Sequence, residues 1–298
     1  MMFNDFPVQY IEPVYRPPSE AKSFILPVTN GCSWNHCSFC SMYTDVQKKF
    51  SVRKESDVLT DIQRAGEQLV GVSRVFLADG DAMTLSFRRL LTVLKALNHA
   101  FLELRRIGAY CLPRNVARKS VEELTELKNN GLSILYVGVE SGDNEVLTRI
   151  KKGETAETTY SALQKIKQAG IKTSVMVLNG LGGQVLSEQH AVNSAKLINR
   201  AQPDYLSILV LTFHRGRQRF VEAFGGDFAE LDSKELLKEM HLFISELNLN
   251  STVFRSDHIS NHLVLKGILG RDKPALLQAI RQALSPECEL PTIALRNI

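Results

Sequence analysis

Short apolar runs alternate with segments of helical periodicity over the first 212 residues of the chain. Six short β-branched or apolar runs, each bounded by turn residues, are typical of strands and cover residues 23–29, 74–78, 105–110, 134–139, 172–178 and 205–212. Amphipathic helices are expected at residues 56–70, 86–97, 156–169 and 187–201, and a capping box at Ser120 and Glu123 opens another. Repeated strand–helix units predict a parallel sheet with crossover helices.

The number of these units predicts an α/β fold in the form of a partial (β/α)6 TIM-like barrel. After residue 212 the pattern changes: residues 220–250 have mostly helical character, 253–267 read as extended or looping, and 272–284 as a final helix. We therefore expect an N-terminal extension at residues 1–21, a core barrel at 22–215 and a mostly helical C-terminal cap at 216–298, packed on the barrel.

Composition narrows the class of protein. With 44% hydrophobic and 23% charged residues, the 298-residue chain resembles soluble proteins with a full core. The net charge of +4 gives no strong case for a nucleic-acid or membrane partner, although it does not exclude nucleic acid. The first ten residues lack the pattern of a signal peptide, and no apolar run approaches the roughly 18 residues needed to span a bilayer. A cytoplasmic location is therefore expected.

Three cysteines lie within nine residues, in the segment TNGCSWNHCSFC that follows the first predicted strand. They are Cys32, Cys37 and Cys40, and they are too close together for a disulfide framework. Three thiolates on a 4Fe–4S cluster leave one iron open to another ligand. The alternatives are a zinc site completed by a distant residue, or reduced core thiols. Cys111 and Cys288 are too few for a second cluster, so one cluster is expected.

Polar residues and glycines follow the other predicted strands, where barrels and open α/β sheets bind their ligands. The second to sixth strands are followed by Asp79-Gly80-Asp81, by Cys111 and Arg114, by Glu140-Ser141-Gly142, by Asn179-Gly180, and by His214 and Arg215. Each group alone has a structural explanation, such as helix capping by the carboxylates. Their convergence on one rim favours a ligand site.

On these residues the chain, over roughly positions 22–215, resembles the radical S-adenosylmethionine (radical SAM) superfamily. Its cysteines are spaced CxxxxCxxC, one residue longer than the usual CxxxCxxC, and Phe39 before the last cysteine matches the family. The resemblance implies one 4Fe–4S cluster on Cys32, Cys37 and Cys40. It also implies SAM as cofactor, reductive cleavage to a 5′-deoxyadenosyl radical that abstracts hydrogen from substrate, and a low-potential electron donor of flavodoxin or ferredoxin type.

The same resemblance implies roles in binding SAM. Asp79, Gly80 and Asp81 occupy the place of the family's GGE-like motif, which holds the methionine amino group, and Glu140 with Ser141 matches the position that contacts the ribose. The turn containing Asn179 and Gly180 resembles the one that packs along the adenine. Arg149 is placed to reach the SAM carboxylate, whereas the neighbouring Lys151 and Lys152 are expected to be surface charges.

Two further residues are candidates for contact with substrate. Cys111 is either a small buried hydrophobe or a hydrogen donor that faces the cavity. His258 lies in the segment FRSDHISNHLVLKG, which crowds polar side chains between apolar ones and either contacts substrate or seals the barrel. That segment, together with residues 16–21, resembles a group of small radical SAM proteins.

Other functions stay open at this point. One is a zinc-stabilised binding protein whose basic loops contact nucleic acid. Another is a radical SAM enzyme similar to the anaerobic porphyrinogen oxidases. A methylthiotransferase is less favoured, because it needs further cysteines for a second cluster.

Overall fold

The computed structural model describes residues 6–213 and 215–285, so His214 and Cys288 lie outside the described residues. By its internal contacts the chain divides into two compact units. The first comprises residues up to 35, 42–137 and 164–172, and the second comprises 36–41, 138–163 and 173 onwards. This division differs from the predicted domain boundaries, which stay a prediction.

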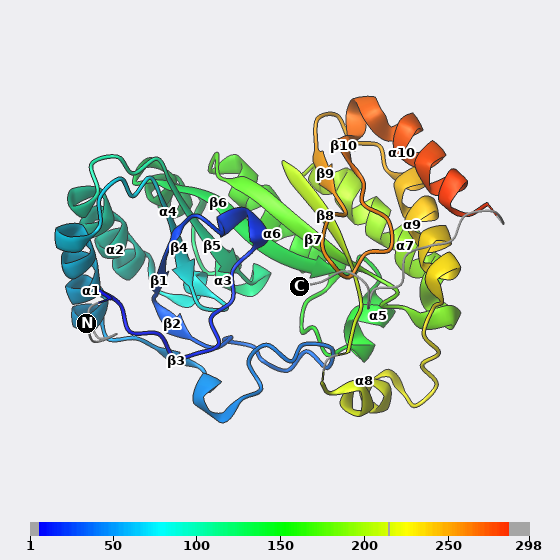
Figure 1. Cartoon of the computed structure of the whole chain (residues 1–298), viewed down its shortest axis with the longest axis horizontal. Helices are drawn as coiled ribbons and strands as arrows, with labels where there is room; N and C mark the ends of the chain where they lie inside the picture. The colour runs from blue at the N-terminus through cyan, green and yellow to red at the C-terminus, as the bar shows by residue number, and fades with distance from the viewer. Residues whose placement is uncertain (1–5, 214, 286–298) are drawn as a thin grey trace. The chain divides into compact units, whose positions relative to one another are not determined.

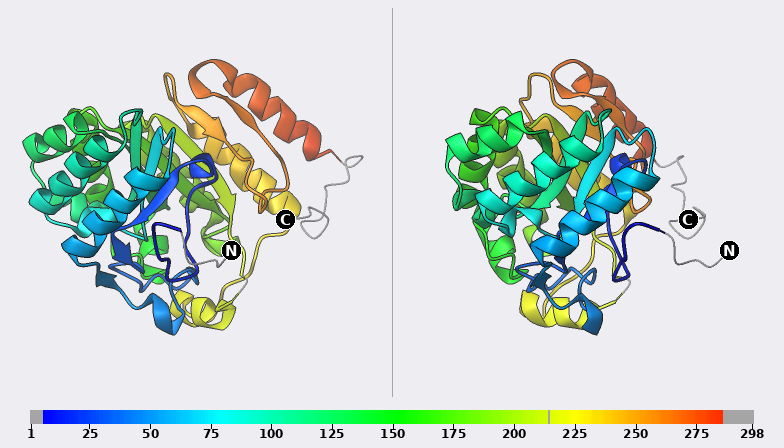
Figure 2. Two further views of the ribbon diagram at one scale, coloured as in Figure 1. Left: turned by 60° about the vertical axis from the view of Figure 1, so that its left-hand side comes forward. Right: turned by 90° about the vertical axis from the view of Figure 1, so that its left-hand side faces the viewer.

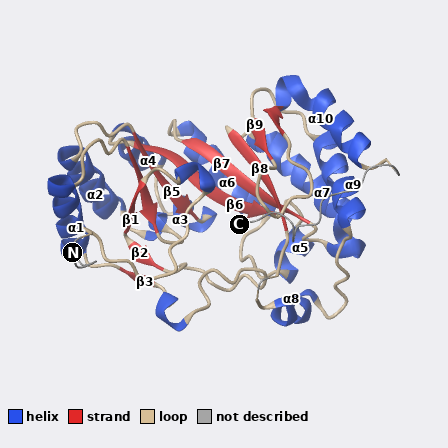
Figure 3. Cartoon of the chain, viewed as in Figure 1, coloured by secondary structure: helices blue, strands red, loops and turns tan. Residues whose placement is uncertain are grey.

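Helices and strands alternate as the sequence predicts (Figure 1; Figure 3). The strands are β1 (Phe24–Pro27), β2 (Thr29–Asn30), β3 (Ser51–Val52), β4 (Arg74–Ala78), β5 (Arg106–Cys111), β6 (Leu132–Glu140), β7 (Lys172–Asn179), β8 (Tyr205–Val210), β9 (Val253–Arg255) and β10 (Lys266–Ile268). The α-helices are α1 (Glu55–Gln68), α2 (Phe87–Ala100), α3 (Pro113–Ala117), α4 (Val121–Asn129), α5 (Asn144–Arg149), α6 (Ala156–Gln168), α7 (Gly183–Ala201), α8 (Arg217–Phe224), α9 (Ser233–Glu246) and α10 (Leu269–Ala283). Short 3-10 helices are η1 (Pro18–Glu20), η2 (Val46–Lys48) and η3 (Ala82–Thr84).

In the first unit β1, β4, β5 and β6 pair in that order, all parallel. Their side chains are largely buried, because crossover helices cover a parallel sheet and leave it no wet face. Helix α1 packs on α2, and α2 on α4. The predicted capping box is confirmed: Ser120 Oγ accepts a hydrogen bond from Glu123 N at 3.1 Å, and Glu123 Oε2 accepts one from Ser120 N at 2.8 Å.

The run at residues 23–29 forms two strands rather than one. Strand β1 ends at Pro27, and Thr29 and Asn30 pair instead with β3 in a small antiparallel sheet. Proline has no N–H to donate, which weakens the ladder at that point. The chain that enters the cysteine segment is therefore held on two sides, by β3 and by the end of β4, where Asp79 N donates to Thr29 Oγ1 at 3.3 Å.

A buried carboxylate ties η1 to the strands of the first unit. Glu20 is 0% exposed, and its Oε1 accepts hydrogen bonds from Arg106 and, at 2.5 Å, from the Tyr136 hydroxyl. Ser23 Oγ donates to Glu20 Oε2 at 2.5 Å. Because Gly108 has no side chain, the carboxylate can lie against β5, where a Cβ would be 3.2 Å from Glu20 Oε1.

In the second unit β7, β8 and β9 are parallel, and β10 is antiparallel to β9. The predicted extended segment is thus a strand pair that widens the sheet. Helix α9 packs against α7 and α10, and the three lie side by side in Figures 1 and 2. No helix among the described residues is long and apolar enough to cross a membrane.

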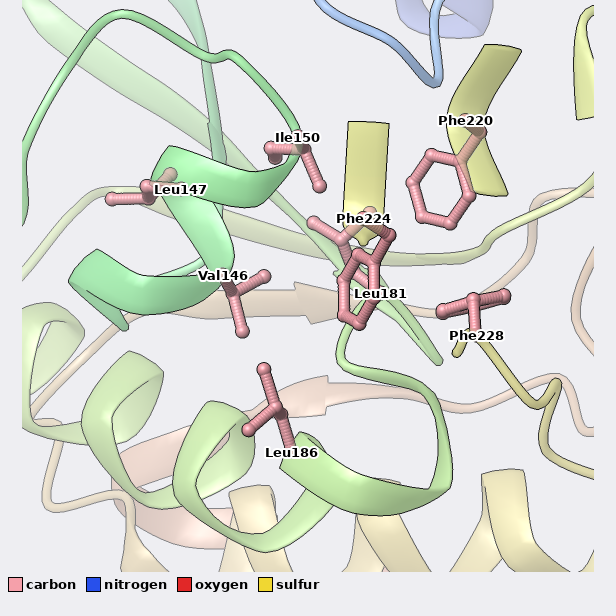
Figure 4. Close-up of a cluster of buried hydrophobic side chains, with 8 residues drawn as sticks. All are labelled: Val146, Leu147, Ile150, Leu181, Leu186, Phe220, Phe224 and Phe228. Carbon is pink, nitrogen blue, oxygen red and sulfur yellow. The ribbon is translucent and has the colours of Figure 1, made fainter. Parts of the chain in front are cut away.

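A hydrophobic cluster joins α5, α7 and α8 within this unit (Figure 4). Phe220, Phe224 and Phe228 pack ring against ring, with centroids 4.7–5.6 Å apart. They face Val146 and Leu147 of α5 and Ile150 just after it, with Leu181 and Leu186 beside them. Phe39 of the cysteine segment packs against this cluster.

Replacing Glu20 by alanine is expected to lower the free energy of unfolding by about 2–4 kcal/mol, because Arg106 and two hydroxyl groups lose a buried acceptor. Urea titration followed by circular dichroism measures this loss. The matched control is Glu67→Ala, since Glu67 is exposed on α1 and accepts one hydrogen bond from Gln63. Equal stability of the two variants would contradict the assignment of Glu20 as a structural anchor.

Candidate active site

The cysteine segment is a series of turns after β2. Cys40 N donates to Cys37 O at 3.2 Å, which closes a turn around Ser38 and Phe39. Ser38 N and Ser38 Oγ both donate to Ile150 O, at 2.9 and 3.3 Å, so the turn is attached to the end of α5. None of Cys32, Cys37, Cys40 and Cys111 is in a disulfide.

The chemistry of the donor set allows a metal centre on this segment. Among the described residues no three His, Cys, Asp or Glu side chains are arranged to hold one metal ion. A mononuclear zinc site needs its ligands to meet at one point, about 2.3 Å from each sulfur. A 4Fe–4S cluster binds each thiolate at a different iron, and thiolates are its usual protein ligands.

Gly80 lies beside Cys32, as the predicted rim requires. A Cβ at Gly80 would be 3.1 Å from Cys32 Cβ and 2.7 Å from the ring of Tyr43. Gly80 N also donates to Gly31 O at 3.2 Å. Only glycine therefore fits here without displacing the ring or the first cysteine, and its backbone lies where a group bound at Cys32 could approach it closely.

The two aspartates on either side of Gly80 are buried and engaged by the protein. Asp79 is 1% exposed, forms an ion pair with the buried Lys48, and accepts a hydrogen bond from the Tyr43 hydroxyl at 2.9 Å. Burial raises the pKa of Asp79, and the bonds from Lys48 and Tyr43 oppose this rise. The carboxylate thus fixes the turn at the end of β4 to the segment that follows the cysteines.

Asp81, the residue after Gly80, is also buried and hydrogen-bonded within the protein. It is 0% exposed and accepts hydrogen bonds from Ser33 Oγ at 2.5 Å, from Asn115 Nδ2, and from Leu112 N at 3.4 Å. Burial raises its pKa to about 6, although the bonds from Ser33 and Asn115 lower it. Since Ser33 is the residue after Cys32, Asp81 ties the cysteine segment to the turn that follows β5.

Glu140 occupies an unusual backbone position at the end of β6. Its φ is 64°, in the left-handed region that a non-glycine residue rarely adopts. The side chain folds back over Gly138, where a Cβ would be 2.1 Å from Glu140 Oε1. Lys152 Nζ donates to Glu140 Oε1 at 3.0 Å and lies 6.0 Å from the centroid of the Phe39 ring. Phe39, Glu140 and Lys152 therefore form one group.

The expectation that Lys152 is a surface charge is wrong, since the residue is only 5% exposed. The buried carboxylate of Glu140 needs a cation, and Lys152 supplies it. Lys151, the preceding residue, is exposed as expected. The periodicity of the sequence carries no signal that separates these two lysines, because both lie in the turn after α5.

Ser141 and Arg149 are engaged within the second unit. Ser141 is 0% exposed, and its Oγ lies 2.8 Å from His190 Nδ1. Arg149 donates to Phe224 O at 3.1 Å and to Glu145 Oε1 at 2.6 Å, and its guanidinium lies 5.0 Å from the centre of the Phe224 ring. Ser141 thus connects the end of β6 to α7, and Arg149 connects α5 to α8.

The turn after β7 is hydrogen-bonded to α9. Asn179 Nδ2 donates to Leu236 O at 2.9 Å, and Gly180 N donates to Glu239 Oε1 at 2.6 Å. Glu239 is 3% exposed, and its Oε2 accepts a hydrogen bond from Ser187 Oγ at 2.5 Å. Gly180 has a φ of 83°, so glycine suits this turn.

The two candidates for substrate contact differ in exposure. Cys111, the last residue of β5, is 2% exposed. His258 is half-buried in the loop between β9 and β10. Ser260 N donates to His258 Nδ1 at 3.2 Å, and the Ser260 hydroxyl lies 2.8 Å from the same nitrogen. This bonding assigns the proton of the neutral ring to Nε2.

The sequence model of the radical SAM superfamily matches residues 26–198, more than half of the chain. The chain belongs to the radical SAM superfamily. It is therefore an enzyme of a family that uses a 4Fe–4S cluster and SAM and needs a reductant and a substrate. The predicted family, enzyme class and cofactors are confirmed.

Curated relatives of this radical SAM protein are distant. It is 21% identical over 189 residues to the heme chaperone HemW of Bacillus subtilis, covering 59% of the chain and 49% of HemW. It is 25% identical over 199 residues to a probable threonylcarbamoyladenosine tRNA methylthiotransferase of Pyrococcus horikoshii, covering 62% of the chain and 44% of that protein. The chain thus spans about half the length of these relatives.

Solved radical SAM enzymes share the fold. Coproporphyrinogen III oxidase (HemN) from Escherichia coli gives a TM-score of 0.57 at 19% identity, covering 75% of the chain and 52% of HemN. The radical SAM methyltransferase TsrM from Kitasatospora setae, with cobalamin and a [4Fe-4S] cluster bound, gives 0.52 at 19% identity, covering 63% and 34%. At such identities the likeness concerns the fold alone, and it confirms the predicted α/β partial TIM-like barrel.

The pH dependence of stability tests the environment of His258. Burial lowers its pKa below the ordinary value near 6.5, and Asp257 only partly opposes this effect. The unfolded chain therefore binds the proton first as the pH falls, so this contribution to stability is present above about pH 6.5 and is lost below it. Between pH 7 and pH 5 the free energy of unfolding should fall more for the wild type than for His258→Gln, as measured by urea titration at each pH. Parallel curves would contradict the buried, neutral assignment.

Proposed function

We propose that this enzyme cleaves SAM reductively at a 4Fe–4S cluster held by Cys32, Cys37 and Cys40, and that the product radical takes hydrogen from a substrate that is still unassigned. When bound, the cluster and SAM supply the one-electron chemistry. The observation that carries the proposal is the match to the radical SAM superfamily, which includes all three cysteines. Their thiols lie outside disulfides on a segment anchored at both Ser33 and Ser38.

In this proposal the residues after β4 have two different roles in binding SAM. Gly80 offers its backbone beside Cys32, while Asp79 and Asp81 hold the turn in shape through Lys48, Tyr43 and Ser33. Rigid turns of this kind reduce the ordering that a ligand must impose when it binds.

The residues of the second unit bind the nucleoside part of SAM. Glu140 contacts the ribose, with Lys152 fixing its carboxylate and Phe39 packed beside them. The turn containing Asn179 and Gly180 packs along the adenine, and α9 fixes this turn through the bonds of Asn179 and Glu239. Ser141 contacts the ribose together with Glu140, and Arg149 reaches the SAM carboxylate.

Cys111 and His258 are proposed as residues of the substrate site. Nε2–H of His258 is a donor whose direction Ser260 fixes through Nδ1, and a fixed donor of this kind suits a carbonyl or carboxylate oxygen of substrate. A flavodoxin or ferredoxin is proposed as electron donor. The core barrel at 22–215 with its C-terminal cap is the proposed working unit.

Formation of 5′-deoxyadenosine tests this function. The protein is purified without oxygen, reconstituted with iron and sulfide, and given SAM and dithionite. The wild type should produce 5′-deoxyadenosine, and Cys37→Ala should lose the brown chromophore and the product. Cys111→Ala, the matched cysteine control, should keep its iron because it is not a proposed ligand. Full iron content in Cys37→Ala would refute the ligand assignment, and one colourless zinc per wild-type chain would refute the cluster.

The ion pair at the end of β6 makes a separate prediction. Lys152→Gln should weaken SAM binding by roughly 10- to 100-fold, because Glu140 loses a charged partner in a buried position and no longer keeps its orientation. Equilibrium dialysis with labelled SAM on cluster-loaded protein measures the change. Lys151→Gln, which removes an equal charge from the neighbouring exposed position, should bind SAM as the wild type does. Equal affinities for the two variants would show that Lys152 does not support the site.

A further inference from the structure

The turn that carries Cys37 and Cys40 is contacted by a residue far away in the chain. Arg219 of α8 donates from Nε to Ser38 O at 3.2 Å and from Nη2 to Cys40 O at 2.6 Å. Together with the bonds from Ser38 to Ile150, these contacts engage the backbone of Ser38 on both its N–H and C=O sides. The turn is therefore held between α5 and α8.

The shape of the arginine side chain matters here. A guanidinium is planar and presents several N–H groups in a fixed fork, so it can bond two carbonyl oxygens at once. A lysine ammonium keeps the charge but lacks this fork. Arg219 thus fixes the relative position of two peptide groups, one of which belongs to a proposed cluster ligand.

The helix that carries Arg219 is itself firmly packed. The next residue, Phe220, is 0% exposed and stacks with Phe224 and Phe228 (Figure 4). Phe39, between the two carbonyls that Arg219 contacts, packs against the same cluster. Thus Arg219 of α8 holds the backbone of this turn, and the hydrophobic cluster around Phe220 holds the side chain of Phe39.

Charge adds a second effect. The guanidinium is always positive, and Nη2 lies 2.6 Å from the carbonyl oxygen of Cys40. Reduction of a cluster adds a negative charge, so a nearby cation stabilises the reduced form and raises the reduction potential.

We propose that Arg219 is a positioning residue of the cluster: its fork holds Cys37 and Cys40 in the ligating conformation, and its charge raises the reduction potential of the cluster. This inference rests on the proposed function, because it takes these cysteines as ligands. It adds a residue from the C-terminal part of the chain to the environment of the metal centre.

The positioning role is tested on the cluster-free protein. Alkylation of Cys37 and Cys40 by iodoacetamide is followed by mass spectrometry, with Cys32, which precedes the turn that Arg219 bonds, as internal reference. Loss of both hydrogen bonds in Arg219→Gln should speed alkylation of Cys37 and Cys40 relative to Cys32 by roughly tenfold. Arg219→Lys should show a smaller increase. Arg217→Gln is the matched control, since Arg217 lies on the same helix and its guanidinium bonds the exposed Glu230 instead of the cysteine turn, as far as the described residues show.

The electrostatic role is tested on the reconstituted protein by redox titration followed by electron paramagnetic resonance. At the solution potential where half of the wild-type cluster is reduced, the reduced fraction should fall to roughly one fifth in Arg219→Gln. It should stay near one half in Arg219→Lys, which keeps the charge beside the turn, and in Arg217→Gln, because the Arg217 charge is already paired with Glu230.

The outcomes separate this inference from the proposed function. If wild type and Arg219→Gln share the same alkylation ratio and the same reduced fraction, Arg219 is not a positioning residue although the cluster exists. If Arg219→Gln loads no cluster, the reduction potential is measured in Arg219→Lys instead. Because this variant keeps the positive charge, a fall of its reduced fraction to roughly one fifth would overturn the electrostatic part of the proposal. If Cys37→Ala keeps all its iron, the proposed function itself fails.

Discussion

Buried carboxylates must be paired, and this constraint shapes every strand-end turn of the site. A charged group taken out of water costs several kcal/mol unless cations or hydrogen-bond donors replace its hydration. Asp79 therefore takes Lys48 and Tyr43, and Glu140 takes Lys152. Each of these partners lies at least 12 positions away along the chain. Satisfying one carboxylate thus fixes two distant segments against each other, and the turn between them becomes rigid.

The buried ion pairs that make these turns rigid are better explained by a role in ligand binding than by a contribution to the stability of the fold. Replacing a buried ion pair by apolar residues of similar volume is often neutral or stabilising, so pairs such as Glu140–Lys152 are a weak reason for stability alone. They are better explained by the turns that they hold, since those turns lie where (β/α) barrels bind ligands. The left-handed backbone conformation of Glu140 also favours a functional role for this turn, because strained residues of this type cluster at functional sites.

The sequence predicts the helices and strands of the molecule more fully than the hydrogen-bond and ion-pair partners of its buried polar groups. Strands and helices follow from alternation and helical periodicity, and the capping box at Ser120 follows from two residues three positions apart. The approach of Gly80 to Cys32 agrees with the rule that ligands gather at strand ends. The partners Lys48, Lys152 and Glu239 could not be predicted, because a charged residue in a turn or on a helix has the same local pattern whether it faces water or a buried group. Only the tertiary structure separates Lys152 from Lys151.

The C-terminal part of the chain supports the strand-end turns directly. Glu239 of α9 bonds the backbone of Gly180, and Arg219 of α8 bonds the backbone of Ser38 and Cys40. Both contacts go to main-chain groups, so they control the path of the turn whatever its side chains are. Because the superfamily model ends at residue 198, these supports lie outside the part of the chain that defines the family. The firmness with which these two turns are held thus depends on residues that the superfamily model does not include.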